Sequence, residues 1–377
     1  MLERLAVLTN NFQDLIIKFV ALIFFGMGAN MKSFKFNKSL AMLLALAILT
    51  TCLAGILRQY SKNNTPFVKT DFIMDTFIEY RLYGEGAEEC VRDISLALRK
   101  MEQDFSSHID SSYISKINNN SGIKQTNAPR ELIDVLERAR EISLETNLNY
   151  NVLIGAVARL WNVTGETPYV PTESEINNVL SLCDINDLEL DRKNNTAYLK
   201  KKGNSLDLGG ILKGEATKTV LEIAKAHGIK KGFVSIGGNM VVVGGEFTFG
   251  IRDPKGSERE YFASLALSDG DTMSTAGGYE RFFEADGKTY AHIFSSKTGA
   301  PAESEFLSVT IVGKDGSACD SLATAIYVGG RELLSSYIDR SDIFIIAVTN
   351  DNKIILSNGD NRGFELNSSN PNNYNLA

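Results

Sequence analysis

This sequence of 377 residues contains few histidines and cysteines and has no excess of positive charge. The formal net charge is -7, and no long run of one sign occurs. A protein that binds a nucleic-acid backbone needs a basic surface, which this composition does not supply. We therefore expect no nucleic-acid partner.

The few cysteines and histidines are also widely spaced, without a C-x-x-C pair. They are Cys52, Cys90, Cys183 and Cys319, and His108, His227 and His292. This spacing indicates neither a zinc site nor a disulfide framework. We expect reduced, mostly buried thiols and no metal site built from several histidines.

One long apolar run, Ser39–Leu57, contains no charged residue and is flanked by lysines and arginine. Its length and flanks predict a secretory signal or an uncleaved membrane anchor, of which we favour the anchor. Lipidation of Cys52 is a second option. A shorter apolar stretch, Leu15–Met27, is either another membrane segment or lies upstream of a true start at Met31. Residues 1–69 are thus predicted to be an anchor and linker.

Residues 70–366 have the pattern of one globular domain, and residues 367–377 that of a flexible tail. The predicted helices are Ala87–Phe105, Arg130–Thr146, Val152–Trp161, Glu173–Leu182 with a capping box from Thr172 to Glu175, Glu215–His227, Ser317–Tyr327 and Glu332–Ile338. The predicted strands are Asp71–Leu82, Gly232–Gly245 with a break at Gly237-Gly238, Phe247–Arg252, Tyr261–Leu267, Tyr279–Glu284, Thr289–Phe294, Phe306–Val312, Ile343–Val348 and Lys353–Ser357. Asp286-Gly287 is predicted to be a hairpin turn between Tyr279–Glu284 and Thr289–Phe294. Helices and strands do not alternate strictly, so we predict an α+β fold.

The stretch Asp207–Gly214 leads from a short apolar segment, predicted as a strand, through two glycines into a helix. Lys213 and the unpaired N–H groups of a helix start favour a bound anion such as phosphate. A simple turn is the alternative, because the order of a Walker loop is absent.

Asp320 and Thr324 lie one helical turn apart, so a carboxylate and a hydroxyl share one face. Such oxygens suit Mg²⁺, although Asp320 is equally explained as a favourable charge near a helix start. His292 ends a predicted strand and precedes a Ser/Lys/Thr/Gly loop, where it is either a proton acceptor or an ordinary edge histidine. Ser274–Gly278 is either a ligand loop or a turn.

The joint occurrence and order of these segments resemble the ApbE family, the FAD:protein FMN transferases. The segments are Met74–Thr76, Asn151–Trp161, Asp207–Gly214, Ser235–Asn239, Gly250–Pro254, Ser274–Arg281, His292–Gly299 and Asp320–Thr324. The resemblance implies a mixed fold of the ApbE or T-fold type with mainly antiparallel sheets. It also implies Mg²⁺-dependent transfer of FMN from FAD to a Thr or Ser hydroxyl of an exported acceptor protein, with release of AMP.

The resemblance further implies roles for individual residues. The metal ligands are Gly210, through its carbonyl, Asp320 and Thr324. The residues that contact FAD are Met74, His108, Asn149, Tyr150, Asn151, Asp207, Lys213 and Phe294. The catalytic residues are His292 and Asp320. The catalytic domain is expected outside the cytoplasmic membrane, held there by the N-terminal segment.

The sequence departs from the family pattern in four places. Asp75 stands in place of glycine, His108 in place of tyrosine, Asn151 in place of aspartate, and Ser295-Ser296 in place of Asp-Pro. These departures leave two alternatives open: a diverged paralogue that only binds FAD, and a Mg²⁺-dependent FAD pyrophosphatase that uses no acceptor.

Overall fold

The computed structural model describes residues 46–53, 64–257, 259–359 and 361–377. The chain divides into two compact units, Met1–Thr65 and Pro66–Ala377. In the first unit residues 46–53 are helical and Cys52 is exposed. The rest of the predicted membrane segment Ser39–Leu57, and all of Leu15–Met27, lie outside the described residues. Within the described ranges no helix is both long enough and apolar enough to span a bilayer.

The second unit is built on a sheet for which the described residues supply nine strands. In sheet order these are β1 (Pro66–Ile73), β2 (Thr76–Tyr83), β6 (Gly232–Ile236), β7 (Asn239–Val242), β10 (Thr272–Gly277), β15 (Phe306–Gly313), β16 (Phe344–Thr349), β17 (Lys353–Leu356) and β19 (Asn375–Leu376). All neighbouring pairs are antiparallel except β17 with β19. Alternate residues of β2 are buried, as the two-residue repeat of a half-covered strand requires.

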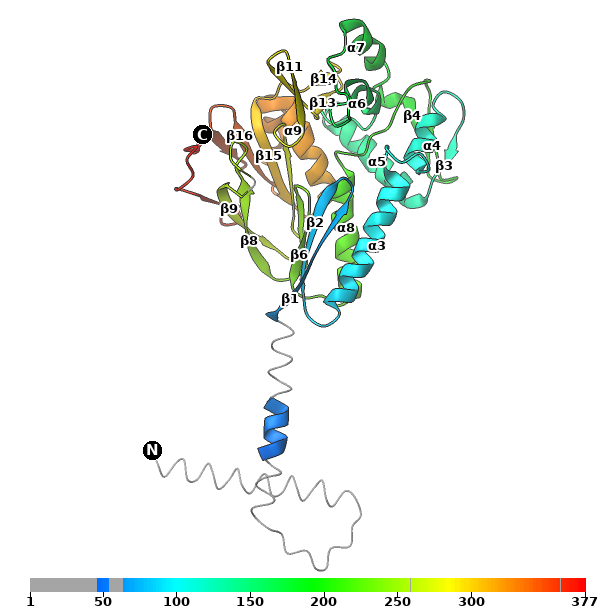
Figure 1. The fold of residues 1–377 in the computed structure, drawn as a ribbon. Coiled ribbons are helices and arrows are strands. Elements are labelled where there is room, and N and C mark those ends of the chain that lie inside the picture. Colours follow the sequence, from blue (N-terminus) through cyan, green and yellow to red (C-terminus); the bar gives the residue numbers. More distant parts are fainter. Residues whose placement is uncertain (1–45, 54–63, 258, 360) are drawn as a thin grey trace, which may run out of the picture. The chain divides into compact units, whose positions relative to one another are not determined.

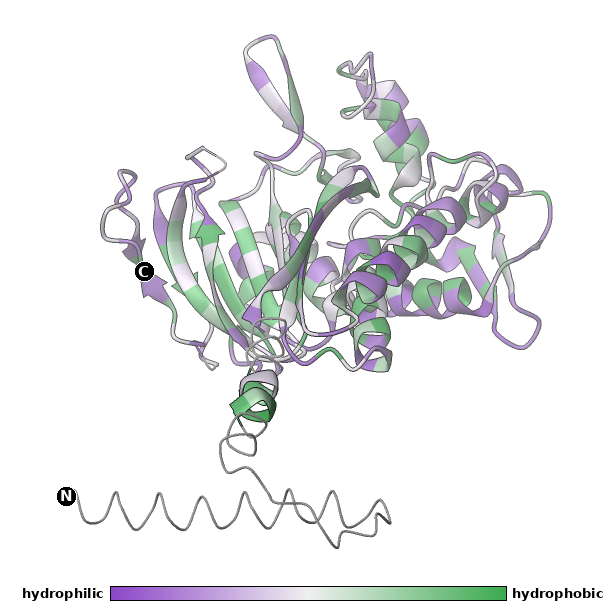
Figure 2. Ribbon diagram, turned by 60° about the horizontal axis from the view of Figure 1, so that its bottom comes forward, coloured by the Kyte–Doolittle hydropathy of each residue, from purple (hydrophilic) through white to green (hydrophobic). Residues whose placement is uncertain are grey.

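Three long helices pack on one face of this sheet (Figure 1). They are α3 (Ala87–Phe105), α8 (Leu212–Ala226) and α9 (Gly316–Tyr337). Apolar residues at helical spacing form the inward face of α3, with Ile94 and Leu98 fully buried against the sheet. Hydrophobic and hydrophilic residues alternate along these helices accordingly (Figure 2).

A smaller sheet packs on the opposite face. It contains β8 (Glu246–Arg252), β9 (Tyr261–Ser268) and β18 (Glu365–Leu366). Phe262 and Leu265 of β9 join Phe344 of β16 in one buried cluster. The large sheet is therefore enclosed between helices and a second sheet.

The remaining elements lie beyond the helices or project from the sheet (Figure 1). They are α4 (Tyr113–Asn119), β3 (Thr126–Asn127), α5 (Arg130–Glu145), α6 (Gly155–Trp161), α7 (Glu173–Leu180), the 3-10 helix η1 (Ile185–Asp187), β4 (Leu188–Asp191), β5 (Thr196–Leu199), β11 (Phe282–Ala285), β12 (Lys288–Ala291), β13 (Phe294–Ser295) and β14 (Ala300–Pro301). The capping box at Thr172 and the hairpin turn at Asp286-Gly287 are confirmed. A mixed α+β fold with mainly antiparallel sheets is also confirmed.

Four predicted elements differ from the structure in type or extent. The strand Asp71–Leu82 is interrupted by a turn at Met74 and Asp75, both with positive φ. Ser274–Gly278 is mostly the sheet strand β10 rather than a loop. The short strand before Gly209 is irregular chain, and α8 begins at Leu212, earlier than predicted.

Other differences lie at the helices and the end of the chain. The two predicted helices around Gly330 form α9, in which Gly330 has non-helical φ and ψ. Cys90, Cys183 and Cys319 are free and buried, as expected. Residues 367–377 do not form a loose tail, because β19 pairs with β17 and Tyr374 is buried.

Candidate functional site

The first turns of α8 and α9 approach each other unusually closely. A Cβ added to Gly214 would lie 2.1 Å from the backbone oxygen of Gly316, and one added to Gly316 would lie 2.5 Å from the oxygen of Gly214. Only glycine leaves room for this contact. Two helix starts thus meet at one point, where α9 presents Asp320.

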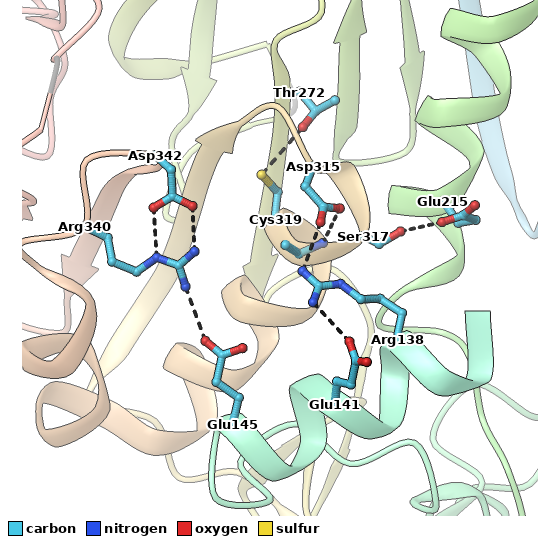
Figure 3. A network of polar contacts seen from close by, with 11 residues as sticks. Arg138, Glu141, Glu145, Glu215, Thr272, Asp315, Ser317, Cys319, Arg340 and Asp342 are labelled. Atoms are coloured by element: carbon cyan, nitrogen blue, oxygen red, sulfur yellow. Dashed lines mark hydrogen bonds and ion pairs between the residues drawn. The ribbon is translucent and has the colours of Figure 1, made fainter. Parts of the chain in front are cut away.

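A polar network fixes the start of α9 (Figure 3). Asp315 caps the helix by accepting a hydrogen bond from the N–H of Ala318 at 3.1 Å, and Arg138 donates to the same carboxylate at 3.0 Å. Ser317 donates to Glu215 of α8 at 2.7 Å. The turn that carries Asp320 is therefore anchored to both α5 and α8.

Asp320 is buried, with 6% of its surface exposed. One carboxylate oxygen accepts a hydrogen bond from the N–H of Gly214 at 3.0 Å, and the other accepts one from the amide of Asn239 at 3.2 Å. Ser274, directly across from Asn239 in the sheet, donates to the amide oxygen of Asn239. These contacts hold the carboxylate in place and leave lone pairs for a cation.

Neutral oxygens lie beside this carboxylate. A Cβ added to Gly210 would lie 3.4 Å from the hydroxyl oxygen of Thr324, so the Gly-Gly turn and this face of α9 are adjacent. The Gly210 carbonyl accepts a hydrogen bond from Ser321 at 3.0 Å. The predicted ligands Gly210, Asp320 and Thr324 are thus brought together.

Tyr150, in the segment 149–151, lies beside the Gly209-Gly210 turn. Its ring lies against Gly210, and its hydroxyl is buried close to the side chain of Ser321. Burial, and then the charge of Asp320, raise the pKa of Tyr150, so the hydroxyl keeps its proton. The Tyr150 hydroxyl therefore adds a neutral polar group to this spot.

Lys213 and Asp207 flank the Gly-Gly turn. The Lys213 ammonium donates to the carbonyl of Gly209 at 3.0 Å, and Asp207 accepts a hydrogen bond from the N–H of the same glycine at 2.7 Å. Both side chains remain partly exposed. The turn is therefore lined by one cation and one anion that can contact a ligand.

His292 faces this region from the segment after β12. Its Nδ1 lies 3.1 Å from the carbonyl oxygen of Arg281. Burial, together with the charges of Arg281 and Lys213, lowers the pKa of His292 to about 4, against a weaker opposing effect of the hydrogen bond to that carbonyl. The ring is neutral at pH 7 and can accept a proton.

The sequence model of the ApbE family matches residues 74–346, which contain every one of these groups. The chain belongs to the ApbE family. The family predicted from the sequence is thereby confirmed.

Relatives in the ApbE family include two proteins named FAD:protein FMN transferase. The Treponema pallidum protein is 29% identical over 288 residues, covering 71% of this chain and 79% of that protein. The Klebsiella pneumoniae protein is 27% identical over 296 residues, covering 78% and 93%. The crystal structure of the ApbE protein from Thermotoga maritima aligns with a TM-score of 0.71 at 25% identity, covering 81% of this chain and 97% of that one.

Other predicted ApbE ligand residues lie along the same side of the site. Lys297 donates to the amide oxygen of Asn149 at 3.1 Å, which ties the loop after His292 to the 149–151 segment. Phe294 packs near Trp161, with ring centroids 6.5 Å apart. The Met74 N–H donates to Glu102 at 2.8 Å, which fixes the hairpin turn to α3.

Two predicted FAD contacts are less well placed. The amide of Asn151 is committed to the chain, donating to the Cys183 carbonyl at 2.7 Å and accepting from the Leu153 N–H at 2.9 Å. His108 is exposed in the turn after α3. Their contacts with FAD stay predictions.

A cavity of about 600 Å³ lies between the β11–β12 hairpin and α6. Trp161, Tyr279, Tyr290 and Tyr327 are among its lining residues, whereas none of the residues predicted to bind FAD or metal lines it. The cavity nevertheless adjoins the predicted site, because Trp161 lines it and packs near Phe294.

Sequence reasoning missed three supporting residues of this ApbE site. Asn239 and Arg281 stand inside segments that carried the resemblance. Asn239 contacts Asp320, which lies 81 residues away, so the sequence does not place the two together. Arg281 lies opposite His292 in the register that a turn at Asp286-Gly287 sets, so this pairing had a signal in the sequence. Glu102 is a half-buried residue of α3 and gave no signal. Each of the three contacts a residue that lies more than ten positions away in the sequence.

Proposed function

We propose that this protein transfers the FMN half of FAD to a Thr or Ser hydroxyl of an acceptor protein, with Mg²⁺, and releases AMP. The observation that carries the proposal is the meeting of the Asp320 carboxylate, two neutral oxygens, the Lys213 ammonium and a neutral His292 around one turn. The names of the ApbE relatives support it.

The residues present fit a magnesium ion. Asp320, the Gly210 carbonyl and the Thr324 hydroxyl supply only oxygen, the ligand type that Mg²⁺ prefers. No group of three or more His, Cys, Asp or Glu side chains suited to a metal occurs in the described ranges, so other ligands would be water and substrate phosphate. Bound there, Mg²⁺ would neutralise charge on the pyrophosphate of FAD.

The chain itself adds two further sources of positive potential. Lys213 lies in the first turn of α8, and that helix end carries a partial positive charge. Both favour a phosphate group at the Gly209-Gly210 turn. The site thus positions the diphosphate and stabilises charge that develops on it.

In the proposed reaction, His292 accepts the proton of the acceptor hydroxyl. The hydroxyl oxygen forms a bond to the phosphorus of the FMN half, and the bond from that phosphorus to the oxygen of AMP breaks. The proton passes to Nε2, because Nδ1 already faces a carbonyl. The negative charge of a bound diphosphate would raise the pKa of His292 toward the range where such transfer is efficient.

The proposal also covers the location of the catalytic domain and the kind of acceptor protein that it modifies. The apolar run Ser39–Leu57 has the length and flanking charge of a membrane anchor. An anchored domain outside the cytoplasmic membrane would meet an exported flavoprotein. We therefore infer an exported acceptor.

The test incubates the purified full chain with FAD and Mg²⁺, with and without a Thr-containing acceptor protein. We expect the acceptor to gain the mass of FMN and one AMP to be released for each FMN attached. Release of AMP and free FMN regardless of acceptor would instead identify a pyrophosphatase. Bound but intact FAD would identify a protein that only stores it, and either result refutes transfer.

A further inference from the structure

The turn between β1 and β2 carries an unexpected residue at its tip. Asp75 has a φ of 54°, in the left-handed region that favours glycine. Holding aspartate in this conformation costs about 1 kcal/mol.

Asp75 contacts Arg281 twice. The guanidinium of Arg281 donates to the backbone carbonyl of Asp75 at 2.7 Å and lies 3.0 Å from its carboxylate. The carboxylate is 73% exposed and the guanidinium 41%, so this ion pair contributes little to the stability of the fold. The effect of the ion pair is instead to fix the position of Arg281.

The backbone of Arg281 holds His292. The carbonyl oxygen of Arg281 accepts the backbone N–H of His292 at 3.0 Å and also lies 3.1 Å from the ring Nδ1. With the ring neutral, the carbonyl can only accept, so Nδ1 carries the hydrogen and Nε2 has the free lone pair. The position of Arg281 thus sets both the tautomer and the direction of the ring.

The turn that carries Asp75 is also held in place. The N–H of Met74, next to Asp75, donates to Glu102 of α3 at 2.8 Å. Polar contacts therefore run from a rigid helix through the hairpin tip to the ring of His292, across more than 200 residues of sequence.

We propose that the Asp75–Arg281 pair is a positioning device that holds the His292 ring with Nε2 directed at the reacting group. This inference rests on the proposed transferase function and extends it to two residues without an assigned role. Asp75 and Arg281 are positioning residues that act through His292.

Two positive charges act on the His292 ring. They are the guanidinium of Arg281 and the ammonium of Lys213 at the start of α8, and both disfavour a charged imidazole. Burial acts in the same direction and is the largest cause. If the pair is broken, the ring gains solvent and its pKa should rise from about 4 toward the ordinary value of about 6.5.

The chain is well suited to a direct test, because it contains only three histidines. The full chain labelled with ¹⁵N-histidine is titrated by NMR without FAD, and the resonances are assigned with a His292→Gln variant. We expect the wild-type His292 ring to show one tautomer, protonated at Nδ1, and to stay neutral down to about pH 5. His227, whose Nε2 lies 2.9 Å from Asp93, serves as the internal reference.

Three variants should give graded effects. Asp75→Asn keeps a side chain that tolerates positive φ and can still accept a hydrogen bond, so His292 should change least. Asp75→Gly suits the backbone but leaves only the carbonyl contact, and Arg281→Ala removes both contacts. We expect the pKa of His292 to rise and its tautomers to mix in that order, while His227 stays unchanged.

Activity provides a second readout. The maximal rate of FMN transfer should fall about tenfold in Asp75→Gly and less than threefold in Asp75→Asn, with the KM for FAD nearly unchanged. An unchanged His292 resonance in Asp75→Gly and Arg281→Ala would overturn the inference. If the wild-type chain transfers no FMN while the NMR result holds, the proposed function fails and the positioning device stands. Asp75→Gly keeps the test valid if Arg281→Ala does not fold.

Discussion

At the scale of single residues, Asp320 must meet two conflicting requirements. As a predicted metal ligand it needs free lone pairs, whereas its burial requires that its charge be matched by hydrogen bonds. The N–H of Gly214 and the amide of Asn239 satisfy one bond on each oxygen. The carboxylate is therefore part of the packing between α8 and α9 as well as a predicted ligand.

This double role decides which variant tests the metal. Asp320→Ala would leave two buried donors unpaired, at a cost of about 1–3 kcal/mol each. Asp320→Asn keeps an oxygen acceptor and the shape but loses the charge. We expect Asp320→Asn to lower Mg²⁺-dependent turnover about 100-fold while the melting temperature falls by only a few degrees. Wild-type turnover of Asp320→Asn at limiting Mg²⁺ would place the metal elsewhere.

Local patterns predicted part of this site and missed the rest for a physical reason. Asp320 with Thr324, and Lys213 after two glycines, are close in sequence, so spacing alone places them together. Asn239 acts on Asp320 of another element, and only the folded topology brings the two together. The sequence predicts the end of α3 at Phe105, but the exposure of His108 in the turn that follows depends on tertiary packing, which local patterns do not specify.

At the scale of elements, the wrong predictions concern strands with unusual composition. Met74 and Asp75 turn the chain without the glycine or asparagine that marks a hairpin, so one long strand was predicted where two occur. The strand β10 is rich in Ser, Thr and Gly, which is typical of turns. It lies inside the sheet because its hydroxyls find partners, as Thr275 does with Thr310 at 2.9 Å.

The contact between α8 and α9 yields the prediction at this scale. In Gly214→Ala the new methyl group would overlap the backbone oxygen of Gly316, which belongs to a helix start and cannot rotate away. The two helices must separate, and we expect the free energy of unfolding in urea to fall by about 1–3 kcal/mol. Asp320 would move with α9, so transfer should fall further than stability explains.

Lys218→Ala is the matched control, because Lys218 is exposed one turn later in the same helix. Its stability should change by less than about 0.5 kcal/mol. Equal stability of Gly214→Ala and Lys218→Ala would mean that the two helix starts are not in contact.

At the scale of the whole molecule, the last residues complete the side of the large sheet opposite the helices. Tyr374 packs against Phe262 of the smaller sheet with ring centroids 5.0 Å apart. Its hydroxyl donates to the buried carboxylate of Asp253 at 2.6 Å, and Asn370 and Asn372 donate to the same group. The Asn-rich composition predicted a loose tail, but these amides are partners for a buried charge.

The resulting prediction concerns Tyr374→Phe, which deletes one hydrogen bond to Asp253 and keeps the ring. We expect a loss of about 1–3 kcal/mol in the free energy of unfolding near pH 7, because one oxygen of a buried carboxylate loses a donor. Tyr261→Phe, at a ring that is 46% exposed, should change it by less than about 0.5 kcal/mol.

The pH dependence of that loss identifies its cause. Burial would raise the pKa of Asp253, but the hydrogen bonds from Tyr374, Asn372 and Asn370 outweigh it and lower the pKa. A carboxylate with a lowered pKa in the folded state contributes stability above its unfolded pKa of about 3.9, and this contribution is lost as the pH falls through the folded value. The difference between wild type and Tyr374→Phe in urea unfolding should therefore shrink below about pH 4. A difference that stays constant down to about pH 3 would show that the ring packing, rather than the bond to the carboxylate, had changed.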